Sequence, residues 1–74
     1  SHNLPMTKVN RNLGQKIRKL RKDRGLTQEE LAFQSRIDYS YLNQIENGKR
    51  NPTIEIIVKI ARVLKTSSEN LLSF

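Results

Sequence analysis

The sequence contains no cysteine, and its only histidine is His2, beside the N-terminus. The lack of cysteine excludes disulfide bonds and thiolate metal sites, and a single histidine excludes a zinc site built from these two residue types. No nucleophile–base pair, metal-binding cluster or phosphate-binding loop is evident either. We therefore expect a protein that is not an enzyme and that has no catalytic site, metal, cofactor or small-molecule effector.

Long apolar segments are also missing, since no run approaches the about 18 residues that a membrane-spanning helix needs. The sequence shows no secretory signal pattern. These two absences predict a soluble, cytoplasmic protein without a membrane partner. With 74 residues, the chain is near the lower limit for a self-supporting hydrophobic core, so we expect one domain.

Positive charge is what the chain has in excess, with 14 lysines and arginines against seven acidic residues. The excess lies in residues 1–25, where eight basic residues accompany Asp23 alone, whereas residues 26–74 hold six residues of each sign. A one-sided basic balance suits a polyanion such as nucleic acid. It also suits a membrane surface, or it serves only to keep the protein in solution. The charge by itself leaves these three roles open.

Hydrophobic periodicity predicts a first helix over residues 10–24. Its apolar stripe consists of Leu13, Ile17 and Leu20. The residues before this helix show no such period and include a proline. We therefore interpret residues 1–9 as a flexible N-terminal arm, partly derived from an expression vector, and residues 10–74 as the folded domain.

Capping residues and further apolar stripes predict four more helices and no strand, which gives an all-α fold of five helices. These helices are expected at residues 28–35, 39–47 and 54–65, followed by a short one after Ser67. Their predicted N-caps are Thr27, Asp38, Thr53 and Ser67. Thr27 and Glu30 have the spacing of a capping box. The core stripe of helix 54–65 is expected to consist of Ile54, Ile57, Ala61 and Leu64.

Residues 36–38 form a short connection between the second and third predicted helices, and such a turn makes the two helices cross steeply. This is a helix-turn-helix arrangement. The exposed side of helix 39–47 is expected to carry uncharged side chains that can hydrogen-bond, namely Tyr39, Ser40, Asn43, Gln44 and Asn47. Asparagine and glutamine can each make two hydrogen bonds to an adenine edge. The other interpretation is a solvated helix face, although such faces are usually rich in salt-linked glutamate and lysine.

Two segments carry a resemblance to a known family, Thr27-Gln-Glu-Glu-Leu-Ala32 and Tyr41-Leu-Asn-Gln-Ile-Glu-Asn-Gly-Lys-Arg-Asn-Pro52. Together with the later apolar pattern, they resemble the phage repressor/Cro-type helix-turn-helix proteins, or XRE family, over residues 10–72. The resemblance implies a repressor-like domain that reads the major groove of double-stranded DNA with helix 39–47. It also implies a sequence-specific transcriptional regulator that binds a pseudo-palindromic operator as a homodimer.

The resemblance further implies roles for single residues. The base-reading positions correspond to Tyr39, Ser40, Asn43 and Gln44. Residues expected at the phosphate backbone are Thr27, Gln28, Arg36, Asn47, Lys49 and Arg50. In some relatives the residue at the position of Arg50 also enters a groove. Arg21 and Glu46 correspond to a buried ion pair that would tie the first helix to the end of the reading helix.

Simpler interpretations of these charges stay open at this point. Arg21 and Glu46 could be ordinary surface charges, and Lys49 and Arg50 could belong to a solubilising loop. In this family the first helix is mostly scaffold. Its lysines are therefore expected to add a positive field rather than to contact DNA.

Three positions depart from the family pattern. Arg36 and Lys65 stand where glycine is common, and a left-handed backbone there would cost on the order of 1 kcal/mol. Phe33 occupies a position that is often polar. It is expected either to cover the edge of the core or to contact another protein.

Dimer contacts and subtype follow less directly from the residues. Apolar residues that could form a dimer patch, or could pack internally, are Ile56, Val58, Val63, Leu72 and Phe74. The run from Ser35 to Tyr41, with Arg50 and Asn51, is most similar to controllers of restriction–modification operons. The alternative function is a protein-interaction module, such as an antitoxin-like partner.

Overall fold

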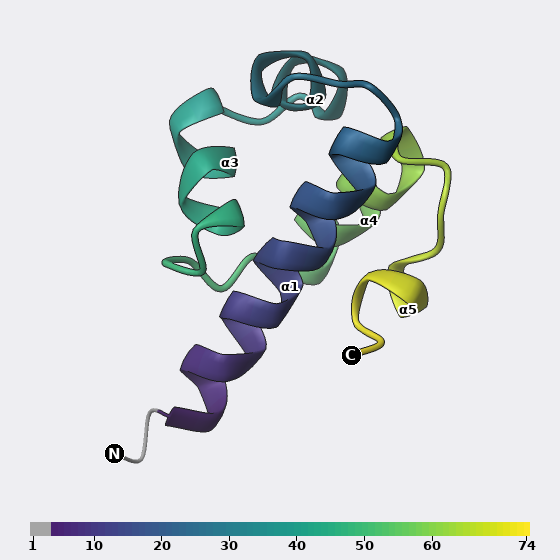
Figure 1. Ribbon diagram of the computed structural model, residues 1–74. Helices are drawn as coiled ribbons and strands as arrows, with labels where there is room; N and C mark the ends of the chain where they lie inside the picture. The colour runs from purple at the N-terminus through teal and green to yellow at the C-terminus, as the bar shows by residue number, and fades with distance from the viewer. Residues whose placement is uncertain (1–3) are drawn as a thin grey trace.

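The computed structural model describes the backbone of residues 4–74, which forms five α-helices and no strand (Figure 1). The helices are α1 (Leu4–Asp23), α2 (Gln28–Ser35), α3 (Tyr39–Glu46), α4 (Ile54–Val63) and α5 (Ser68–Leu71). Side chains are described from Lys8 onward. The predicted all-α fold of five helices is confirmed.

Helix α1 begins at Leu4, six residues before the start that the sequence predicted. Residues 4–9 of the expected flexible arm are therefore helical, and residues 1–3 lie outside the described residues. Pro5 is compatible with this start because a first-turn N–H has no acceptor within the helix. The prediction stopped short because Pro5 indicated a non-helical segment, although Val9 and Met6 stand four and seven residues before Leu13 and extend the spacing of the apolar stripe.

Each of the other four helices starts with a side-chain N-cap, as predicted. Thr27 Oγ1 accepts from the Glu30 N–H at 3.0 Å, and Glu30 Oε1 accepts from the Thr27 N–H at 2.8 Å, which completes the capping box. The other confirmed N-caps are Asp38, Thr53 and Ser67. These local hydrogen bonds fix where each helix starts and hence how short its connection to the preceding helix is.

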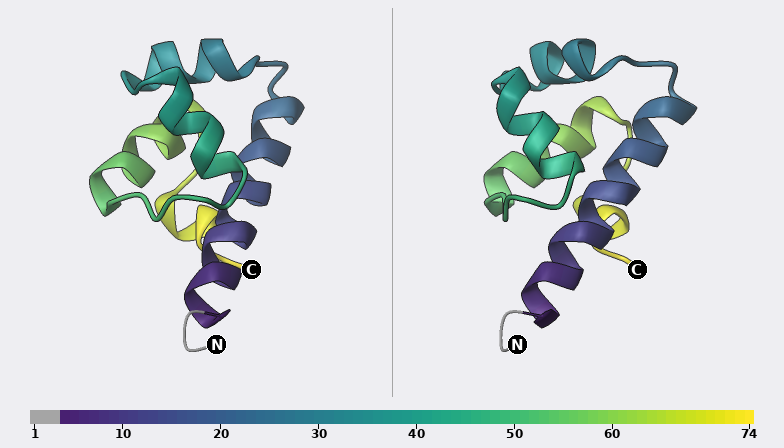
Figure 2. Two further views of the ribbon diagram at one scale, coloured as in Figure 1. Left: turned by 90° about the vertical axis from the view of Figure 1, so that its left-hand side faces the viewer. Right: turned by 60° about the vertical axis from the view of Figure 1, so that its left-hand side comes forward.

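The turn between α2 and α3 passes through Arg36, whose backbone is left-handed with a φ of 58°. Lys65, after α4, has a φ of 57°. Both positions thus have the conformation for which glycine is favoured, and each costs on the order of 1 kcal/mol. Figure 2 shows α3 descending steeply from the end of α2, and no other described helix lies in front of α3 in the left view. The predicted helix-turn-helix is confirmed.

The hydrophobic core draws on all five helices. Its fully buried large side chains are Leu13, Ile17, Leu31, Leu42, Ile45, Ile60, Leu64 and Leu71. Ile54 was expected in the core stripe of α4, but it is 65% exposed and that expectation is wrong. It is the first residue of α4, where the helix projects beyond the core, and Ile60 joins Ile57 and Ala61 on the buried side instead.

Helix α1 runs against the C-terminal end of α3, and two glycines permit the close approach (Figure 1). A Cβ atom on Gly14 would lie 2.7 Å from the Glu46 carbonyl oxygen and would also clash with that of Ile45. Gly48 has a φ of +75°, and a Cβ there would lie 2.9 Å from the Cα of Arg11. Backbone atoms on both sides leave no room for adjustment, so these glycines bring the two helices within reach of a shared ion pair.

Candidate nucleic-acid interface

The outer face of α3 carries the side chains that the sequence assigned to base reading. Tyr39 is 49% exposed and Ser40 is exposed, whereas Asn43 and Gln44 are half-buried. Leu42, Ile45 and Glu46 occupy the opposite, buried side. The helix therefore presents uncharged hydrogen-bonding groups outward, with the N-cap Asp38 at its start.

A polar groove joins this face to α1 and to the start of α2. Its lining residues are Arg18, Arg21, Leu26, Thr27, Gln28, Glu29, Tyr39, Asn43 and Asn47. The groove brings together two expected phosphate contacts at the start of α2 with two expected base-reading residues of α3. These residues are distant in sequence, and the helix-turn-helix geometry makes them neighbours.

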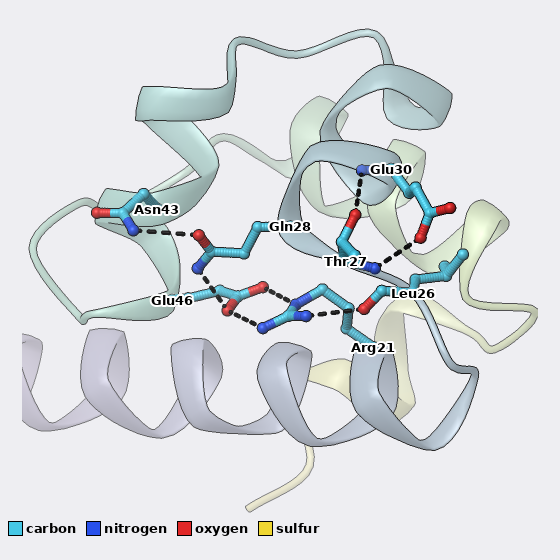
Figure 3. Close-up of polar contacts among 7 residues, drawn as sticks. All are labelled: Arg21, Leu26, Thr27, Gln28, Glu30, Asn43 and Glu46. Atoms are coloured by element: carbon cyan, nitrogen blue, oxygen red, sulfur yellow. Dashed lines mark hydrogen bonds and ion pairs between the residues drawn. The ribbon is translucent and has the colours of Figure 1, made fainter.

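Arg21 and Glu46 form a buried ion pair at the floor of this region (Figure 3). Arg21 Nε donates to Glu46 Oε2 at 2.7 Å, and Nη2 donates to Oε1 at 3.1 Å. Arg21 Nη1 donates to the Leu26 carbonyl oxygen at 2.8 Å. The guanidinium thus links α1, the loop before α2 and the end of α3, in a geometry that satisfies both charges.

The ion pair continues as a hydrogen-bonded chain toward the outer face of α3. Gln28 Nε2 donates to Glu46 Oε1 at 2.9 Å, and Gln28 Oε1 accepts from Asn43 Nδ2 at 3.1 Å (Figure 3). Asn43 Oδ1 in turn accepts from Asn47 Nδ2 at 3.2 Å. This chain fixes the orientation of the Asn43 amide, with Nδ2 toward Gln28 and Oδ1 toward Asn47. Nδ2 keeps one further hydrogen to donate, and Oδ1 keeps one further acceptor position.

The expected phosphate contacts lie in three places. Thr27 and Gln28 lie at the start of α2, and Asn47, Lys49 and Arg50 lie at or just past the end of α3. Arg36 is not among the residues that line the groove. It lies instead in a separate pocket with Lys59 and Arg62 of α4.

Arg18 is a member of the groove that sequence reasoning did not single out. It precedes Arg21 by three residues, so the two lie on one face of α1. That spacing could have identified it once Arg21 was assigned to the ion pair. Two lysines of α1 make contacts elsewhere, since Lys16 donates to the Ser73 carbonyl oxygen and Lys19 pairs with Asp23.

Other kinds of site find little support within the described residues. They contain no cluster of three or more histidine, cysteine or acidic side chains that could hold a metal ion. None of the helices in this part of the chain is long and apolar enough to cross a membrane.

Comparison with known proteins identifies the family to which this fold belongs. The pattern of a helix-turn-helix family, HTH_3, matches residues 17–71. The chain belongs to this XRE-type helix-turn-helix family. It is thereby a DNA-binding transcriptional regulator, and the predicted resemblance is confirmed.

Similar members of the family include control proteins and a regulator solved with DNA. The control protein C.MunI of a Mycoplasma species is 38% identical over 69 residues, which cover 92% of this chain and 93% of the relative. The restriction-modification controller protein C.AhdI from Aeromonas hydrophila superimposes with a TM-score of 0.82 and 40% identity, over 84% of this chain and 94% of that one.

The biofilm regulator SinR has been solved in complex with DNA. Its structure gives a TM-score of 0.78 and 39% identity, over 82% of this chain and 98% of that chain. The full SinR protein of Bacillus subtilis is longer, and the present chain spans 55% of it.

Replacing Glu46 by glutamine should destabilise this XRE-type domain strongly. The change leaves the Arg21 guanidinium buried without a counter-charge, which costs about 3–5 kcal/mol of unfolding free energy. Urea denaturation followed by circular dichroism measures the loss. Asp23→Asn is the matched control, because it breaks an exposed ion pair with Lys19 and should cost at most about 1 kcal/mol. Equal losses for the two variants would contradict the structural role of the buried pair.

Proposed function

We propose that this regulator recognises a specific duplex sequence by laying the outer face of α3 in the major groove. The observation that carries the proposal is the hydrogen-bonded chain from Arg21 to Asn47, which holds the face in one arrangement before binding. Side chains that are already ordered lose less conformational freedom when they bind. The proposed base-reading residues are Tyr39, Ser40, Asn43 and Gln44. The similarity to SinR, which was solved with DNA, supports this mode.

Phosphate contacts are proposed on both sides of the reading face. At the start of α2, the N–H groups of Gln28 and Glu29 have no acceptor within the helix, and the helix dipole favours an anion there. The side chains of Thr27, Gln28 and Arg18 adjoin them. Beyond α3, the proposed contacts are Asn47, Lys49 and Arg50. A phosphate contact by Arg36 stays a prediction. It rests on the separate positive cluster that Arg36 forms with Lys59 and Arg62.

We propose a homodimer on a pseudo-palindromic operator, in the manner of a restriction–modification controller. One α3 covers about half a site, and a two-fold dimer places two such helices about one DNA turn apart. Ile56 and Val63 pack against the core, whereas Leu72 and Phe74 remain exposed near the C-terminus. Val58 is half-buried and is not among the side chains packed against the core. Val58, Leu72 and Phe74 are therefore the proposed dimer contacts. The similarity to C.MunI and C.AhdI supports the controller subtype.

A protein-interaction module is the second candidate, and one observation favours it. Phe33 is 84% exposed on α2, where an aromatic side chain adds nothing to the core. In that case, replacing Asn43 or Gln44 by alanine should leave function intact.

Selection from a random duplex library, with sedimentation of the selected complex, tests the proposal. We expect an enriched motif made of two related half-sites, bound by two protomers. Selection of no motif at any salt concentration would overturn the sequence-specific function. One protomer on one half-site would overturn the homodimer alone.

Replacing Arg18 by alanine should weaken binding to all duplexes alike. A lost phosphate contact lowers affinity without changing base preference, and it reduces the slope of log affinity against log salt by about 1. Fluorescence anisotropy at several salt concentrations measures this slope. Lys19→Ala removes the same charge from α1 but outside the groove, so its slope should stay close to that of the wild type. Identical slopes for Arg18→Ala and Lys19→Ala would show that Arg18 contributes only to the general field.

A further inference from the structure

The loop after α3 folds back so that Arg50 contacts the reading helix. Arg50 Nε donates to Gln44 Oε1 at 2.6 Å. The guanidinium carbon also lies 5.6 Å from the centre of the Tyr41 ring, within the range of a cation–π contact. Two different groups of α3 therefore hold one arginine that belongs to the loop.

Gln44 has a central place on the outer face of α3. Residues 40, 44 and 47 follow one another at spacings of four and three, which places them on one stripe opposite the buried Leu42 and Ile45. Tyr41 lies at the edge of that face and is partly buried against the core. The contact with Gln44 thus carries a charged loop residue onto a face that is otherwise uncharged.

The hydrogen bond changes what the Gln44 amide can offer to a base. A free glutamine presents one donor side and one acceptor side, which together match the N7 acceptor and N6 donor of adenine. Here Arg50 Nε occupies one of the two acceptor positions of the Gln44 oxygen, and the cation lies beside that oxygen. The Nε2 hydrogens of Gln44 and the Nη hydrogens of Arg50 then make donors more numerous than the single acceptor position that is left.

We propose that Gln44 and Arg50 act as one donor-rich recognition unit that selects guanine at one position of each half-site. This inference rests on the proposed function, because it requires α3 to lie in the major groove. Guanine presents two adjacent acceptors, N7 and O6, to such a unit. Adenine would place its N6 donor against the guanidinium, cytosine offers a donor, and thymine offers a single acceptor beside its methyl group.

This assignment gives Arg50 a base-reading role in place of the phosphate contact proposed for it above, and it separates Arg50 from its neighbour Lys49. Lys49 is exposed in the same loop, and as a phosphate contact it carries no base preference. Arg50 acts through a hydrogen bond to a base-reading side chain. Its removal should therefore change which base is preferred, because it takes the cation away from the Gln44 oxygen and frees both acceptor positions of that oxygen.

The test compares base preferences of the full chain and of its Arg50→Ala, Gln44→Ala and Lys49→Ala variants. Each is used to select from the same random duplex library, and affinities are then measured on duplexes that differ at one base pair. The wild type should favour guanine over adenine by roughly 10- to 100-fold at one position. Arg50→Ala should turn that preference toward adenine, and Gln44→Ala should abolish it. Lys49→Ala should lower affinity for all duplexes and keep the guanine preference.

The outcomes separate this inference from the function on which it rests. If the wild type selects no motif, the proposed function fails. If a motif is selected but Arg50→Ala keeps every base preference, the donor-rich unit is overturned and the proposed function stands. A wild-type preference for adenine at the position that Gln44→Ala affects would overturn it equally. Circular dichroism of each variant checks folding, and we expect native spectra because Arg50 is exposed.

Discussion

The buried ion pair between Arg21 and Glu46 determines where the reading helix lies, and the rest of the site depends on it. Charges removed from water must be paired and hydrogen-bonded, which leaves α1 and α3 one well-satisfied arrangement. Gly14 permits that arrangement, since any larger residue would separate the two helices. Gln28 hydrogen-bonds both to Glu46 of the buried pair and to Asn43 on the outer face, so the fixed position of the pair also fixes the Asn43 amide. An interior interaction thereby organises a surface that is otherwise free to move.

In the proposed binding mode, affinity and specificity come from different parts of the chain. The net positive charge lies in the first 25 residues, whereas the outer face of α3 is uncharged. The two parts meet at Arg18 on one side of the face, and Arg50 brings a second charge from the loop on the other side. A polyanion is attracted by the general field, while directional hydrogen bonds decide where it stops.

Local features were predictable from sequence, and features that depend on distant contacts were not. N-caps and the short turn follow from residue types at fixed spacing, whereas the left-handed backbone of Arg36 was expected from the glycine that the family has at this position. The ion pair came from the family resemblance, because periodicity does not identify a partner 25 residues away. The close approach at Gly14, the place of Arg18 and the bond from Arg50 to Gln44 need the packed helices. The early start of α1 at Leu4 was missed because Pro5 indicated a non-helical segment, although Met6 and Val9 extend the apolar spacing.

The central claim is that the buried pair orders the reading face through Gln28. The most direct measurement is the ratio of affinities for the selected duplex and a scrambled duplex, in the wild type and in Gln28→Met. Methionine keeps the length of the side chain and removes both of its hydrogen bonds. A lost phosphate contact would lower both affinities equally and leave their ratio unchanged. A change in the ratio therefore reports the loss of the fixed Asn43 orientation. We expect the ratio to fall by about 10-fold with the fold intact. An unchanged ratio would contradict the claim.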